Sequence, residues 1–362
     1  IKYGMISVII HEVGHNYFPM IVNSDERQWT WMDEGLNSYL QFLAEQEWDR
    51  DYPSRRGPAK NIVNYMKSDK KNLMPIMTNS ESIYQFGNNA YGKPATALNI
   101  LRETIVGREL FDFAFKEYSK TWMFKHPTPS DFFRILENAS AVDLDWFWRG
   151  WFYSTDPVDI SIDEVKWYTL DTRNPEIEFP LKKLDEENEP TQSWEEKNRI
   201  EIQETIVEID EEANDFYNKY DPYEVTILDM EDFIKYRDSS VVEPQEKRIY
   251  NSNLNYYEIK FSNVGGLVMP IILELQYEDS TNYIIRIPAE IWRKNRDQIT
   301  KVFATKKLVK SFNLDPQLET ADINLINNNW PRKTIKSKFE LYKSKKNNSC
   351  LLYTSDAADE HG

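Results

Sequence analysis

The spacing of apolar and polar residues predicts two helices near the start of the chain. The apolar run MISVII, residues 5–10, contains no proline or glycine, so it predicts a buried helix that continues to His15. After an interval rich in turn residues, the pattern predicts a second helix from about Trp31 to Trp48. Side chains on these two elements would therefore be held by rigid backbone rather than by loops.

Further along, residues 108–153 have apolar positions at three- and four-residue spacing, which predicts more helices. One of them opens with Thr128 as its cap, Pro129 at its first position and Asp131 three residues after the cap. The last carries six aromatic residues between positions 146 and 153, a density that favours the protein core over the wall of a substrate groove. The polar, Pro- and Gly-interrupted stretch 49–84 predicts helix fragments and loops.

From about residue 256 the pattern becomes one of short strands separated by turn residues. The segments that alternate or run apolar are YYEIKFSN, GGLVMPIILELQYED, NYIIRIP, TKVFATKK and LVKSFNLD. Strands at this spacing predict an antiparallel β-sandwich of about 90 residues. Asp315 and Asp322 follow these strands without the fixed offsets of a calcium loop, so ordinary polar loops are favoured there.

These patterns predict a multidomain α+β protein. A mainly helical domain covers residues 1–160, an acidic linker or helical connector covers 161–250, and the β-sandwich covers 251–345. Residues 350–362, which begin CLLYTSDAADE, resemble translated read-through of a sequencing adapter and are set aside from the fold. The chain begins at Ile1 inside a helix, with no initiator methionine or capping residue, so we expect an upstream part to be missing.

Composition narrows the function classes. Lys and Arg number 44 against 60 Asp and Glu, and this net charge of −16 argues against nucleic acid as a partner. No apolar run approaches the roughly 18 residues of a membrane span, so no transmembrane segment is expected. The single cysteine, Cys350, lies in the adapter-like tail, so neither disulfides nor thiolate ligands are expected, and the compartment stays open.

Candidate chemistry gathers in residues 11–40. His11 and His15 are four residues apart, so on a helix they share a face and can chelate one metal ion. Glu12 is turned about 100° from His11, where a general base for a metal-activated water belongs. Eighteen residues separate His15 from Glu34, which lies in the first turn of the second helix and offers a third ligand. A His, His, Glu set leaves zinc one open position, as catalytic sites require.

This spacing resembles that of a known family. HExxH, then eighteen residues, then Glu-Gly is similar to the gluzincin metallopeptidases, and among them to the M1 aminopeptidases. Phe18, Trp31 and Gly35 agree with the zinc region of that family. The pair at 19–20, Pro-Met, stands where the family commonly has Gly-Asn, four and five residues after the second histidine, which leaves the candidate ligands intact.

A second segment supports the same resemblance. NNAYGKPATALNIL, residues 88–101, is similar to the Tyr-x-Lys-Gly stretch of the family, in which the tyrosine stabilises the transition state. The correspondence falls on Tyr91 and Lys93, with Pro94 in place of the glycine. Proline suits the first turn of a helix, so Tyr91 is expected just ahead of a helix start.

The resemblance implies the helical half of a thermolysin-like zinc peptidase domain. It implies one Zn²⁺ ion held by His11, His15 and Glu34, and peptide-bond hydrolysis in which Glu12 acts as general base on a zinc-activated water. Tyr91 would donate to the developing oxyanion. Peptides are the expected partners, and the oligomeric state is open.

Exopeptidase action is implied by the family alone. Its members anchor the free amine of the substrate on a Gly-x-Met-Glu-Asn strand that precedes the zinc helix, and the residues present begin too late to include one. A thermolysin-like endopeptidase, which needs no such anchor, and an inactive peptide-binding module are the alternatives. We also expect residues 1–349 expressed alone to fold poorly or to bind zinc without efficient catalysis.

Overall fold

The computed structural model describes residues 2–213, 215–238 and 254–334. The adapter-like residues 350–362 and both limits of the predicted sandwich lie outside the described residues. The described chain forms two compact units. The first contains residues 2–166, 258–302 and 308–334, and the second contains 167–238, 254–257 and 303–307.

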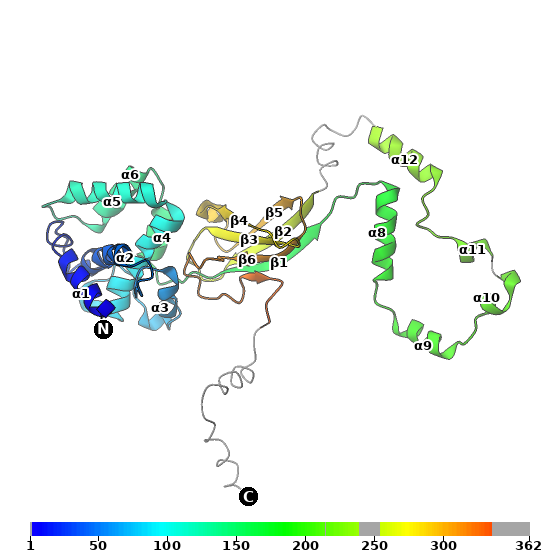
Figure 1. Ribbon diagram of the computed structural model, residues 1–362, viewed down its shortest axis with the longest axis horizontal. Coiled ribbons are helices and arrows are strands. Elements are labelled where there is room, and N and C mark those ends of the chain that lie inside the picture. Colours follow the sequence, from blue (N-terminus) through cyan, green and yellow to red (C-terminus); the bar gives the residue numbers. More distant parts are fainter. Residues whose placement is uncertain (1, 214, 239–253, 335–362) are drawn as a thin grey trace, which may run out of the picture. The chain divides into compact units, whose positions relative to one another are not determined.

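The predicted pair of N-terminal helices is present. Helix α1 spans Lys2–Gly14, and α2 spans Leu36–Trp48 directly after a π-helical turn, η1, at Trp31–Gly35 (Figure 1). The two helices pack closely at Gly14, where an added Cβ would lie 2.0 Å from Oδ1 of Asn37. A larger residue than glycine at this position would therefore push the histidine-bearing end of α1 away from α2.

The prediction that residues 5–10 form a buried helix is wrong about burial. The helix forms, but Met5, Val8, Ile9 and Val13 are exposed. The reason is that α1 packs against α2 through the side that carries His11, and the apolar outer side is uncovered in the described chain.

The predicted helical region at 108–153 is confirmed, with short helices before it. The α-helices are α3 at Val63–Met66, α4 at Lys93–Ile100, α5 at Arg108–Trp122, α6 at Pro129–Ser140 and α7 at Asp145–Trp151. The 3₁₀ turns are Ala59–Asn61, Lys70–Asn72 and Ser80–Ser82, and the π-helical turns are η5 at Gly87–Gly92 and η6 at Leu101–Ile105. Helix α6 begins as predicted, because Asp131 accepts from the Thr128 amide at 2.9 Å in a capping box.

An aromatic core joins α6 and α7 to the turn that precedes α2. The ring of Trp31 stacks on Phe133 at 5.9 Å and meets Phe152 edge-on at 4.8 Å, and Phe133 stacks on Trp148 at 4.5 Å. All four rings are buried, so the aromatic cluster of α7 is mainly core. Each such pair adds about 1 kcal/mol beyond its buried area, and Trp31 is thereby fixed three residues before Glu34.

The described strands from Ile160 onward form antiparallel sheets, so the helix-plus-sheet class predicted from the sequence is confirmed. One sheet has the order β1-β2-β5, with β1 at Ile160–Tyr168, β2 at Asn255–Asn263 and β5 at Gln298–Thr305. The other has the order β4-β3-β6-β7, with β3 at Ile271–Tyr277, β4 at Asn282–Ile287, β6 at Val309–Leu314 and β7 at Asn329–Trp330. A 3₁₀ turn, η8, at Ala289–Arg293 follows β4. The strand pairs of this second sheet are antiparallel, and Leu273 of β3 lies opposite Ile285 of β4 on one side and opposite Leu314 of β6 on the other.

The acidic segment is a series of short, exposed helices. They are α8 at Pro175–Glu187, α9 at Ser193–Glu201, α10 at Ile206–Ile209, η7 at Glu211–Ala213, α11 at Phe216–Lys219 and α12 at Ile227–Asp238. Helix α8 begins where Asn174 caps it, with its side chain accepting from the Glu176 amide, and Pro175 takes the first position. None of the described helices is both long and apolar enough to cross a membrane.

The loop between β6 and β7 buries a carboxyl group. Asp322 accepts hydrogen bonds from the amides of Ile160 at 3.1 Å and Asn324 at 2.8 Å, and Asp315 likewise accepts from backbone amides. Burial raises the pKa of Asp322 to about 7, against the lowering effect of those amides, and the charges of Asp159 and Asp315 add to the rise. These carboxyl groups thus hold their own loops together.

Stability should depend on pH through Asp322. The folded state holds this proton up to a pH of about 7, whereas the unfolded chain releases it near 3.8, so the free energy of unfolding should fall as pH rises through that window. An asparagine at position 322 cannot ionise, so the free energy of unfolding of Asp322→Asn should fall less across this pH window, by on the order of 3 kcal/mol. Denaturant unfolding followed by tryptophan fluorescence at several pH values measures this, and identical pH profiles would contradict it.

Candidate functional site

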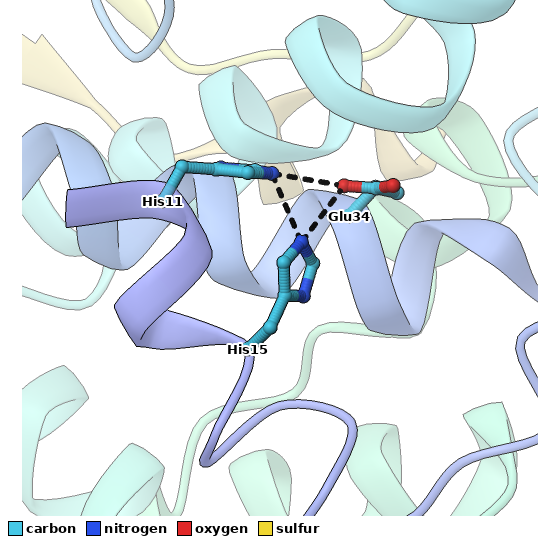
Figure 2. Close-up of side chains that lie close together, drawn as sticks. All are labelled: His11, His15 and Glu34. Atoms are coloured by element: carbon cyan, nitrogen blue, oxygen red, sulfur yellow. Dashed lines mark hydrogen bonds and ion pairs between the residues drawn. The ribbon is translucent and has the colours of Figure 1, made fainter. Parts of the chain in front are cut away.

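Three side chains, from α1, the residue that follows it and η1, bring their electron-pair donors together (Figure 2). The Nε2 atom of His11 lies 3.0 Å from Oε2 of Glu34 and 3.1 Å from Nε2 of His15, and the remaining distance, His15 Nε2 to Glu34 Oε2, is 3.5 Å. The ligand atoms of the three residues all lie within 4.8 Å of one another. The structure therefore groups the three candidate ligands that the sequence singled out.

The orientation of the His11 ring is set by a neighbour one helix away. Its Nδ1 lies 2.9 Å from Oε1 of Gln41, and Nε2 of Gln41 donates to Oε1 of Glu45 at 2.7 Å. A carboxylate only accepts, so Glu45 fixes which end of the Gln41 amide faces His11. The Nδ1 atom of His11 must then carry the hydrogen, which leaves Nε2 with a free electron pair.

His15 is held in the same tautomer by a carbonyl. It lies one residue beyond α1, and its Nδ1 donates to the carbonyl oxygen of Phe18 at 2.9 Å. A carbonyl cannot donate, so here too Nε2 is left with its electron pair. Oδ1 of Asp33 lies 2.9 Å from the same nitrogen, but it accepts no hydrogen bond there because the N–H points at Phe18.

The grouped atoms fit a divalent metal ion. Two imidazole nitrogens and a carboxylate oxygen, none of which carries a hydrogen, face one shared point, and lone pairs in that arrangement repel until a cation lies between them. Burial raises the pKa of Glu34, but other contacts, among them a hydrogen bond from the Tyr91 hydroxyl, outweigh burial and hold that pKa below its ordinary value. The carboxylate of Glu34 is thus ionised and able to bind a cation.

Two candidate site residues lie in π-helical turns. Glu34 belongs to η1 and Tyr91 to η5, and such turns are rare and common at functional sites. Gly35 of η1 packs against both η5 and the start of α4, since a Cβ added at Gly35 would lie 3.0 Å from the carbonyl oxygen of Ala90 and 2.6 Å from Cγ of Pro94. The proline that departs from the family pattern therefore fits against the glycine that follows Glu34.

Tyr91 and Glu12 lie beside the triad without belonging to it. The ring of Tyr91 stacks on that of His11, with centroids 5.8 Å apart. Burial raises the pKa of Tyr91, and its contact with Glu34 adds to the rise, so the phenol keeps its proton and can donate it in a hydrogen bond. Glu12 is exposed on the helix that carries His11, and it lines the same cleft.

The cleft around the triad has a volume of about 590 Å³. Besides the predicted residues, it is lined by Gln41, Glu45 and Arg56, none of which the sequence pointed to. Gln41 and Glu45 lie seven and eleven residues after Glu34, so helical spacing could have placed them on the inner face of α2. Arg56 lies in a loop after α2 and gives no such signal.

The matched family model is that of the peptidase family M1 domain, over residues 2–151. Glutamyl aminopeptidase from Sus scrofa is 28% identical over 144 residues, which are 38% of this chain and 15% of that protein. Glutamyl aminopeptidase from Bos taurus is 25% identical over 171 residues, which are 46% of this chain and 18% of that protein.

A crystal structure of Legionella pneumophila aminopeptidase A in complex with aspartic acid covers 92% of this chain and 27% of that chain, with 12% identity and a TM-score of 0.46. This chain matches less than a fifth of the length of each of the two mammalian relatives.

Metal binding at the candidate site should depend on Gln41. Gln41→Leu removes the acceptor that fixes the tautomer of His11, so we expect the affinity for a divalent metal ion, measured with Zn²⁺, to fall about 10- to 100-fold. Competition with a chromophoric chelator measures this. Gln46→Leu is the matched control, because Gln46 is on the same helix but donates to Ser54 instead of reaching His11. Equal affinity in the two variants would contradict the assignment.

Proposed function

This chain belongs to peptidase family M1 through its residues 2–151, and we propose that it carries the zinc site of an aminopeptidase. The observation that supports this most is the convergence of three hydrogen-free donor atoms, from His11, His15 and Glu34, within the segment that matches the family. Three protein ligands leave a fourth position open, which is the arrangement of catalytic rather than structural zinc.

In this proposal the three ligands hold one Zn²⁺ ion. When bound, zinc supplies a Lewis acid that polarises the scissile carbonyl and lowers the pKa of water toward about 7. Gln41 and the Phe18 carbonyl keep both imidazoles in the tautomer that binds. The aromatic core behind Trp31 holds Glu34 in place.

Glu12 and Tyr91 supply the proton chemistry. Glu12 makes no hydrogen bond or ion pair with a described residue, so its carboxylate is free to take a proton from the attacking water and pass it to the departing amine. Tyr91, which keeps its proton, donates a hydrogen bond to the oxyanion that develops at the scissile carbonyl.

Turnover and metal binding should separate in two variants. Glu12→Gln removes the base but no ligand, so it should keep one Zn²⁺ per chain and lose hydrolysis about 10²- to 10⁴-fold. His15→Ala should lose both. Elemental analysis and peptide hydrolysis by the native protein measure the two effects, with Glu47→Gln on the exposed side of α2 as control. Full turnover by Glu12→Gln would exclude this mechanism.

The position of cleavage is tested with a matched pair of substrates. An aminopeptidase should hydrolyse an aminoacyl anilide that has a free amine and spare the same compound once it is N-acetylated, and a zinc chelator should stop the reaction. Cleavage of the acetylated compound or of internal bonds would instead support a thermolysin-like endopeptidase. If the zinc-loaded protein cleaves neither compound, the result would support the third alternative, an inactive peptide-binding module.

A further inference from the structure

We propose that Arg56 binds a carboxylate group of the substrate next to the scissile bond. The inference rests on the proposed peptidase function and adds to it a chemical feature of the substrate. Arg56 lies in the loop after α2 and lines the same cleft as His11 and Glu34. Three observations support this role: Arg56 lies in the cleft, it has no ion-pair partner among the described residues, and the nearest carboxylates already have other partners.

The guanidinium lies close to the reaction centre. Its Cζ atom is 4.2 Å from the centroid of the Tyr91 ring, and that ring stacks on His11. A cation over an aromatic face is attracted to the ring, so this contact holds Arg56 beside the proposed oxyanion donor. A group bound by Arg56 would therefore lie within a residue or so of the bond that is cleaved.

Arg56 is poorly satisfied in the described chain. It is half-buried, and burial lowers its pKa from the ordinary value. Among the described residues its one hydrogen bond runs from Nη1 to Oγ of Ser38, at 3.3 Å, and no carboxylate there comes within 4.0 Å. A guanidinium has five N–H donors, so most of them are left for a ligand.

The nearest acids are committed to other partners. Glu34 and Glu45 both raise the pKa of Arg56 from a distance, but neither forms an ion pair with it. Glu34 faces the two histidines. Both oxygens of Glu45 are occupied, by hydrogen bonds from Ser7, Gln41 and Ser54.

A half-buried cation without a counter-ion costs free energy until an anion reaches it. A carboxylate suits this site best, because it pairs with the planar guanidinium through two parallel hydrogen bonds. A substrate can supply one as an acidic side chain before the scissile bond, as an acidic side chain after it, or as the free terminus of a dipeptide. The chemistry is the same in all three cases.

The test measures binding of isosteric pairs that differ by one carboxylate. The pairs are glutamate and glutamine, Ala-Glu and Ala-Gln, and Ala-Ala and Ala-Ala amide, titrated by calorimetry into the zinc-loaded native protein. At least one carboxylate member should bind about 10- to 100-fold more tightly than its partner. Arg56→Gln should abolish that preference, and the pair that shows it identifies the source of the carboxylate.

Two further variants keep the test decisive. Arg55→Gln is the matched control, because Arg55 lines the same cleft and the charge change is identical, but its side chain is exposed. It should keep the preference. Arg56→Lys retains the charge and loses the paired hydrogen bonds, so an intermediate preference is expected even if Arg56→Gln folds poorly.

Several outcomes would overturn the proposal. The first is that the wild-type protein shows no preference for the carboxylate member of any pair, and the second is that Arg55→Gln loses the preference as fully as Arg56→Gln. The third is that Arg56→Gln lowers kcat for neutral and acidic substrates alike but keeps the binding preference, which would mean that Arg56 acts through Tyr91 alone. Since calorimetry needs no turnover, a preference that depends on Arg56 in a protein without hydrolysis would reject the peptidase proposal and leave the carboxylate site standing.

Discussion

The structure of the first unit depends on one constraint: three lone pairs that repel one another must be held at a single point. His11, His15 and Glu34 meet this condition because each histidine has an acceptor behind it that fixes its hydrogen on the far nitrogen. For His15 the acceptor is a backbone carbonyl, and for His11 it is the amide of Gln41, which is itself oriented by the buried Glu45. The donor set is therefore arranged for a cation before any ion arrives.

Packing supplies the stiffness that this arrangement needs. The rings of α6 and α7 enclose Trp31, and the residues from Trp31 to Leu36 are almost all buried, so the π-helical turn that carries Glu34 cannot relax into an ordinary helix without disturbing the core. Gly14 and Gly35 mark close approaches to α2 and to Pro94. Together these contacts relate α1, η1 and η5 to one another, and the candidate ligands, base and oxyanion donor come from these elements and the residues that adjoin them.

Charge in the cleft is balanced unevenly. The carboxylates of Glu34 and Glu45 both have partners. The guanidinium of Arg56 lies over the ring of Tyr91 and has no ion-pair partner among the described residues. One cleft thus combines three candidate metal ligands, a candidate general base and a guanidinium without an ion pair among the described residues, which is the set that the proposed peptidase and its proposed preference for a carboxylate require. The acidic helices between Trp167 and Asp238 belong to the other unit.

Local spacing is enough to predict several features of this chain. Period and capping act over a few residues, and they account for the histidine pair four residues apart, Glu34 at the start of the next helix, the Thr128 capping box and the alternating strands after residue 256. Other features depend on neighbours that are distant in sequence and become visible only in the folded chain. Burial of residues 5–10 could not be judged from their apolarity, because it depends on what lies against the helix. Folding likewise sets the π-helical turns and the hydrogen bond from His11 to Gln41, because both depend on residues that no local pattern brings together. It also leaves Arg56 with Ser38 as its one hydrogen-bond partner among the described residues.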